Sequence, residues 1–133
     1  MKLRVAVDGG TRGNPGPAAI GAVLSTPDGE VVDEVAERIG EATNNVAEYR
    51  ALLRGLERAR ALGATEVEVT NDSELVARQV GGAYKVKHAG LRPLYDQAMQ
   101  ALQGFDRWSL RSVPREQNAE ADRLVNQALD AEG

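Results

Sequence analysis

The sequence predicts an α/β fold with a mixed five-stranded sheet, in which three antiparallel strands are followed by two strands parallel to the first, and helices on both faces. Two observations support this prediction. Residues 3–39 contain three extended stretches separated by turn signals, which is typical of an antiparallel meander. After residue 43 helical and extended patterns alternate, which is typical of crossovers that add parallel strands.

The three strands of the meander are expected at residues 3–8, 18–26 and 30–39. Apolar and polar residues alternate in the first stretch, "LRVAVD". "PDG" at 27–29 is a hairpin turn signal between the second and third strands. Five glycines and two prolines crowd residues 6–21, so we expect a loop between the first two strands.

The second half begins with a helix over residues 44–63, where apolar residues recur at helical spacing and Gly63 is the natural stop. The remaining elements are a strand at 65–72, helices at 73–80 and 90–104, a strand at 107–113 and a helix at 118–130. Asn118 is the expected N-cap of the last helix. With no linker or repeat in the sequence, we expect one domain over residues 1–133.

The composition restricts the kinds of site that the chain can build. There is no cysteine and only one histidine, which excludes thiolate and multi-histidine metal sites and leaves oxygen ligands for magnesium, manganese or calcium. The net charge of −4 disfavours a dedicated nucleic-acid binder, although four clustered catalytic acids would account for it. No signal peptide or membrane span is evident, so we expect a cytoplasmic protein.

The glycine-rich stretch does not fit the common phosphate-binding loops. A Walker-type loop needs a lysine near its end, and a dinucleotide loop needs a helix after it. Here there is no lysine, and the following "AAIGAVL" is typical of a strand. The glycines therefore serve either a close approach of the backbone to a ligand or an ordinary connection between strands.

Four acids fall in positions that could bring them together. Asp8 ends the first predicted strand and Asp72 the fourth, so the two converge if these strands are parallel neighbours. Glu48 and Asp122 border the apolar stripes of two helices. Clustered carboxylates repel one another unless a cation holds them, and such a cluster is what two magnesium ions need for phosphoryl chemistry.

Each acid also has a purely structural interpretation. Glu48 could form a capping box with Asn45, and Asp72 could cap the helix that begins at Ser73. Asp122 could favour the dipole of its helix, and Asp8 could accept bonds from glycine amides in an Asx turn.

Four segments together resemble ribonuclease H type I, the nuclease family that cuts the RNA strand of RNA/DNA hybrids. They are "DGGTRGNPGPAAIG", "TNNVAEYRALLRGL", "NDSELV" and "VPREQNAEADRLVNQAL", and each carries one of the four acids. The resemblance runs from about residue 3 to residue 129 in the expected order. It implies a ribonuclease H-like fold and a metal-dependent endoribonuclease that leaves 5′-phosphate and 3′-hydroxyl ends.

The resemblance also implies roles for individual residues. Asp8, Glu48, Asp72 and Asp122 would bind two Mg²⁺ ions, with Mn²⁺ as a substitute, and would form the catalytic centre. The implied contacts to the RNA/DNA hybrid are, in chain order, Gly9, Gly10, Asn14, Thr43, Asn44, Ser73 and Glu74. We expect a monomer that needs no membrane and no obligate protein partner.

Two departures from the family pattern matter. Many members carry a histidine in the loop before the last acid, whereas "VPREQN" has none, and Arg115 or Glu116 could replace it. The basic segment at 81–93 is short, and it is either a phosphate contact or a solvated face. The alternatives to a hybrid-specific nuclease are a relative that also cuts double-stranded RNA, a non-catalytic hybrid-binding module, and an α/β domain without such a site.

Overall fold

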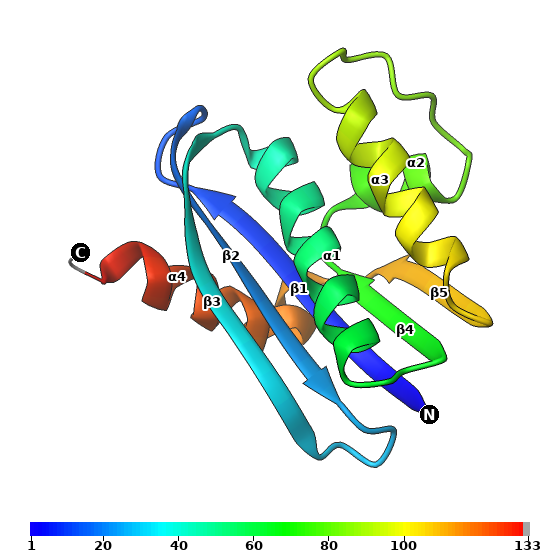
Figure 1. Cartoon of the computed structure of the whole chain (residues 1–133). Helices are drawn as coiled ribbons and strands as arrows, with labels where there is room; N and C mark the ends of the chain where they lie inside the picture. Colours follow the sequence, from blue (N-terminus) through cyan, green and yellow to red (C-terminus); the bar gives the residue numbers. More distant parts are fainter. Residues whose placement is uncertain (132–133) are drawn as a thin grey trace.

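A computed structural model describes residues 1–131, and its five strands form one mixed sheet in the order β3-β2-β1-β4-β5 (Figure 1). The strands are β1 (Lys2–Thr11), β2 (Gly16–Ser25), β3 (Val31–Ala42), β4 (Glu66–Asn71) and β5 (Arg107–Ser112). β2 is antiparallel to both β1 and β3, whereas β4 is parallel to β1 and β5 is parallel to β4. The predicted fold class is therefore confirmed.

Helices cover both faces of this sheet, as predicted (Figure 1). They are α1 (Asn44–Ala61), α2 (Glu74–Val80), α3 (Arg92–Gln103) and α4 (Ala119–Asp130), with a 3₁₀ helix, η1 (Arg115–Asn118), directly before α4. α1 and α4 lie on opposite faces. The larger core lies under α1, and a smaller one under α4 contains Ala19, Val125 and Leu129.

The alternation seen in the first strand decides which side chains enter the larger core. Val5 and Val7 are buried beneath α1. α1 can approach these two valines closely because Gly55 has no side chain. A Cβ on Gly55 would lie 2.8 Å from Val7 and 2.9 Å from Val5. After α1, Gly63 adopts a φ of +90°, which ends the helix where the sequence predicts.

The first hairpin is longer than the sequence predicts. β1 was expected to end at Asp8, but its pairing with β2 continues as far as Thr11 and Ala18. The loop is thereby reduced to residues 12–15. Several glycines that indicated a loop lie instead within strands, where the absence of a side chain permits close contacts. A Cβ on Gly16 would lie 2.1 Å from the Arg12 carbonyl oxygen.

β1 also extends beyond its other neighbour, β4. The last pair between these two strands is Ala6 with Thr70, whereas β1 remains paired with β2 on its other side. Past Ala6, none of the strands within residues 1–131 lies beside the edge of β1 that faces β4. Asp8 lies in this stretch, two residues beyond the last pair, in the interior of β1 and not at its end.

No helix within residues 1–131 combines the length and the apolar character needed to cross a bilayer.

Candidate functional site

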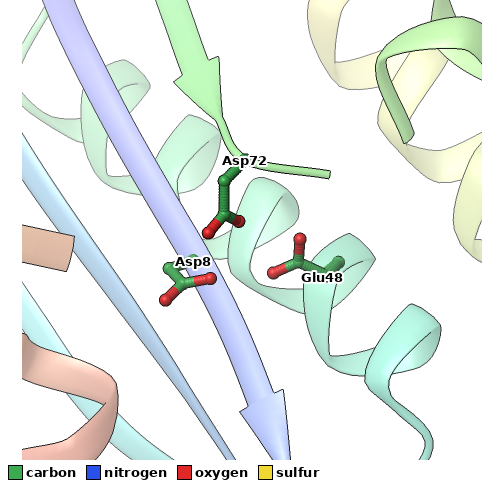
Figure 2. Close-up of side chains that lie close together, drawn as sticks. All are labelled: Asp8, Glu48 and Asp72. Carbon is green, nitrogen blue, oxygen red and sulfur yellow. The ribbon is translucent and has the colours of Figure 1, made fainter. Parts of the chain in front are cut away.

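Three carboxylates from separate elements meet beside the unpaired stretch of β1. Asp8, Glu48 and Asp72 each offer an oxygen that lies within 4.8 Å of the others. In Figure 2, Asp8 comes from β1, Glu48 from α1, and Asp72 from the chain just after β4. β1 and β4 are parallel neighbours, and Asp8 and Asp72 converge as the sequence predicts for that arrangement.

Asp8 is the most buried of the three acids, with 6% of its surface exposed. Its burial, which is the largest cause, and the negative charges of Glu48, Asp72 and Asp122 together raise the pKa of the carboxyl from 3.8 to about 9. A carboxyl in this environment is unfavourable in its ionised form unless a positive charge compensates it.

Glu48 is held in the first turns of α1 by its contact with β1. Its Oε1 accepts a hydrogen bond from the backbone N–H of Gly9. The helix can come this close because Gly9 has no side chain. A Cβ on Gly9 would lie 2.2 Å from the carbonyl carbon of Ala47. The pKa of Glu48 is raised to about 7, because burial raises it by more than the bond from Gly9 lowers it.

The capping interpretation of Glu48 is wrong. The N-cap of α1 is Thr43, whose hydroxyl accepts from the N–H of Val46 at 3.2 Å. Glu48 does not close a capping box with Asn45, because its carboxylate is bonded to the strand. The N–H of Gly9 in β1 needs an acceptor where α1 packs against the strand, and the Glu48 carboxylate provides it.

Asp72 is likewise not a helix cap. Ser73 caps α2 by accepting from the N–H of Val76 at 3.2 Å, and its own N–H donates to Oδ1 of Asn71 at 2.6 Å. The neighbours of Asp72 therefore satisfy the start of α2. The Asp72 carboxylate points toward Asp8 (Figure 2).

Asp122 on α4 lines the same cleft but stands outside the group of three. Its Oδ1 lies 3.7 Å from a guanidinium nitrogen of Arg115, and its Oδ2 accepts from Asn126 at 3.3 Å. Its charge contributes to the raised pKa of Asp8. Sequence reasoning did not single out Asn126, which lies one helical turn after Asp122 on the same face.

The residues expected to contact the substrate fall into two sets. Gly9, Gly10, Asn44 and Ser73 line the cleft together with the four acids. The others surround it: Oδ1 of Asn14 accepts from the N–H of Asn44 at 3.0 Å, Thr43 caps α1, and Glu74 lines an adjoining hollow beside Arg115. Their contacts with a substrate stay predictions.

The donor set of the cleft fits a divalent cation that prefers oxygen. Carboxylate oxygens are the ligands that Mg²⁺ and Mn²⁺ select. The one histidine, His88, is exposed, and its Nδ1 accepts from the N–H of Gly90. The burial and the neighbouring carboxylates that disfavour the ionised form of Asp8 are the conditions that a bound cation relieves.

Comparison with known proteins gives matches over nearly the whole chain. The family described as "Reverse transcriptase-like" matches residues 6–128. The Mycobacterium tuberculosis protein named "Bifunctional protein Rv2228c" is 52% identical over 132 residues, which make up 98% of this chain and 36% of that protein. The chain thus spans about a third of the length of the mycobacterial relatives that it matches.

Solved structures agree closely with the fold. The crystal structure of RNase H1 from the archaeon Halobacterium salinarum has a TM-score of 0.95 and 46% identity, with 98% of each chain covered. The structure of LC11-RNase H1 in complex with an RNA/DNA hybrid has a TM-score of 0.92 and 44% identity, with 96% of each chain covered.

Proposed function

Since the chain belongs to the ribonuclease H family, we propose that it is a metal-dependent endoribonuclease that hydrolyses the RNA strand of RNA/DNA hybrids. The observation that carries this proposal is the meeting of Asp8, Glu48 and Asp72 within 4.8 Å, with Asp122 in the same cleft. The proposal has further support from LC11-RNase H1, a relative whose structure is described as a complex with such a hybrid.

The four acids would hold the cation site, with Mg²⁺ as the expected metal and Mn²⁺ as a substitute. Two ions bound there would supply the Lewis acidity for attack of a water on the scissile phosphate and for departure of the 3′-oxygen, leaving 5′-phosphate and 3′-hydroxyl ends. Asp8 is the best candidate to contact both ions, because the charges of Glu48, Asp72 and Asp122 all act on its carboxylate. Gly9 keeps Glu48 in place by donating to its carboxylate.

The cleft wall would recognise the hybrid. Asn44 and Gly10 line it, and Asn14 supports Asn44 through the 3.0 Å bond to its backbone N–H. We expect Gly9, Gly10 and Asn14 to approach the ribose 2′-hydroxyls, the groups that distinguish RNA from DNA. Thr43 and Asn44 would meet a phosphate of the DNA strand, as the resemblance implies. Ser73 lines the cleft beside Asp72 and is placed for a further contact.

Arg115 is the better candidate to replace the missing loop histidine. It lies 3.7 Å from Asp122 and lines the cleft, whereas Glu116 lines a groove on the α4 face of the sheet. Its exposed guanidinium is placed to attract the phosphate that leaves with the product. Arg115→Ala is expected to slow multiple-turnover cleavage more than single-turnover cleavage. Glu116→Ala is the matched control and should alter neither, and equal effects of the two variants would refute this role for Arg115.

The test of the function uses three labelled duplexes: an RNA/DNA hybrid, double-stranded RNA and double-stranded DNA, each with Mg²⁺ or Mn²⁺. The expected result is cleavage of the RNA strand of the hybrid alone, with 5′-phosphate ends. Asp8→Asn should abolish cleavage, and Asp96→Asn, on the exposed side of α3, should preserve it.

Each other outcome identifies a different function. Cleavage of double-stranded RNA as well would favour the broader nuclease. Binding of the hybrid without cleavage in either metal would favour a non-catalytic module. Monomeric action and a cytoplasmic location stay predictions, and size-exclusion chromatography with light scattering tests the first of them.

A further inference from the structure

The hydrogen bonds of β1 near the site are completed by side chains. Within the β1–β4 ladder, residues pair in steady register from Lys2 with Glu66 to Ala6 with Thr70. Two more steps of this register would place Asp8 opposite Asp72. In a parallel ladder, the residue opposite Asp8 would donate its N–H to the carbonyl of Val7 and accept from the N–H of Gly9.

Asp72 cannot take that place as a strand residue, because β4 ends at Asn71 and the chain turns into α2. Two side chains bond the groups that it would have paired. The carboxylate of Glu48 accepts from the N–H of Gly9, and Nδ2 of Asn118 donates to the carbonyl of Val7 at 2.9 Å. These two bonds flank Asp8 along the strand.

Asn118 is unusual for a residue at the start of a helix. It occupies the N-cap position of α4, as predicted from the sequence, but its side chain makes no capping hydrogen bond. It is instead buried, with 2% of its surface exposed, and its amide reaches across 111 positions of sequence to β1. The predicted capping role is therefore wrong, since the side chain bonds β1 and not the first turn of its own helix.

The energetics of Asn118 point away from a role in stability alone. Its Oδ1 is buried and has no hydrogen-bond partner among the residues that the structure describes. A buried amide with one end unsatisfied loses much of what its other bond contributes. The position of Asn118 is better explained by the two acids that it links. It lies four residues before Asp122, and it bonds Val7, the residue just before Asp8.

We propose that Asn118 is a positioning residue for the proposed metal site. Its side chain replaces the missing β4 partner of Val7 and so fixes Asp8 relative to Asp122. This proposal rests on the proposed function only for its cleavage readout. Without the bond from Asn118, the unpaired stretch of β1 is free to shift relative to α4. The carboxylates would then lose the spacing that a cation needs.

The experiment compares two variants of this residue with one control. Asn118→Leu keeps the approximate shape and removes the donor. Asn118→Ser also removes the reach to Val7 but supplies a good N-cap, which favours folding of α4. Gln79→Met is the matched control, because it removes a buried hydrogen bond away from the cleft, which Oε1 of Gln79 accepts from the Tyr49 hydroxyl at 2.6 Å. All are measured by thermal unfolding, by calorimetric titration with Mn²⁺ alone, and by hybrid cleavage.

We expect both Asn118 variants to fold and to unfold within about 5 °C of the wild type. Their affinity for Mn²⁺ should fall by about tenfold or more, and kcat should fall by a similar factor with KM within about threefold. Gln79→Met should lose stability yet keep its Mn²⁺ affinity and kcat within about threefold of the wild type.

Three results would overturn the proposal: a folded Asn118 variant with wild-type Mn²⁺ affinity and kcat, equal losses in Gln79→Met, or failure of both Asn118 variants to fold, which would make the residue a requirement of the fold. If the wild type binds Mn²⁺ with an affinity that falls in the Asn118 variants, but leaves the hybrid intact, the proposed function is refuted and the positioning role is supported. The two failures are thereby distinguished.

Discussion

Replacing Asp8 with asparagine should stabilise the metal-free protein while it abolishes cleavage. Because burial and the neighbouring carboxylates raise the pKa of Asp8 from 3.8 to about 9, the folded protein holds a proton there at pH 7 that the unfolded chain releases. Asparagine resembles the protonated aspartic acid in shape and needs no proton. The variant therefore avoids the cost of protonating the carboxyl at neutral pH.

The magnitude follows from the gap between the pH and the ordinary pKa of the group. pH 7 lies about three units above 3.8, and each unit corresponds to about 1.36 kcal/mol, so Asp8→Asn should gain up to about 4 kcal/mol at pH 7. A raised pKa contributes stability that is complete below pH 3.8 and is lost progressively as the pH rises toward 9. The gain in the variant should therefore grow between pH 5 and pH 8.

The assay is denaturant unfolding in excess chelator at a series of pH values, repeated in saturating Mg²⁺. With metal, the difference should shrink or reverse, because the wild type gains the binding free energy of the ion and the variant does not. The reasoning would be refuted if Asp8→Asn were no more stable than the wild type at pH 7 in chelator, or if the difference were independent of pH.

Three further predictions follow from the same structure. Gly9→Ala should destabilise the protein by about 2 kcal/mol or more, because its Cβ would meet the backbone of α1 at 2.2 Å, whereas Gly10→Ala meets a side chain at 3.2 Å and should cost less; equal denaturation midpoints would contradict this. Asn14→Ala should weaken hybrid cleavage while Mn²⁺ binding measured by calorimetry stays nearly intact, and a loss of Mn²⁺ affinity would assign that residue to the metal site instead. Asp33→Asn should cost about 1 kcal/mol at pH 7 and less at pH 3, because its bonds to Arg58 hold the pKa of Asp33 below 3.8 and that stability is lost as the pH falls through the lowered pKa; an unchanged cost at pH 3 would count against the ion pair.

The sequence was informative wherever a local pattern and the final environment agree. Alternation in β1 predicted the buried face that contains Val5 and Val7, and helical spacing predicted α1 up to its stop at Gly63. The order of strands also predicted that Asp8 and Asp72 would converge, because parallel neighbours end at the same edge of a sheet.

What the sequence did not predict depends on contacts between distant segments. Glycine is a signal for turns, but Gly9 and Gly16 lie in strands. Glycine is needed at these two positions because backbone atoms of other residues occupy the space that a side chain would take. Asparagine before a helix is a signal for capping, but Asn118 bonds a strand that is 111 positions away. No local pattern distinguishes these uses from the common ones, since the deciding partner lies elsewhere in the chain.

The β1 strand, which extends past β4 and leaves Asp8 beside an open edge, has a consequence for the order of folding. The acids around that edge belong to the first strand, the first helix, the end of the fourth strand and the last helix. A nascent or partly folded chain without its final helix therefore lacks Asp122 and the amide of Asn118. High-affinity binding of a cation would therefore require the complete fold. Measuring it would show whether the first strand and the last helix have packed together.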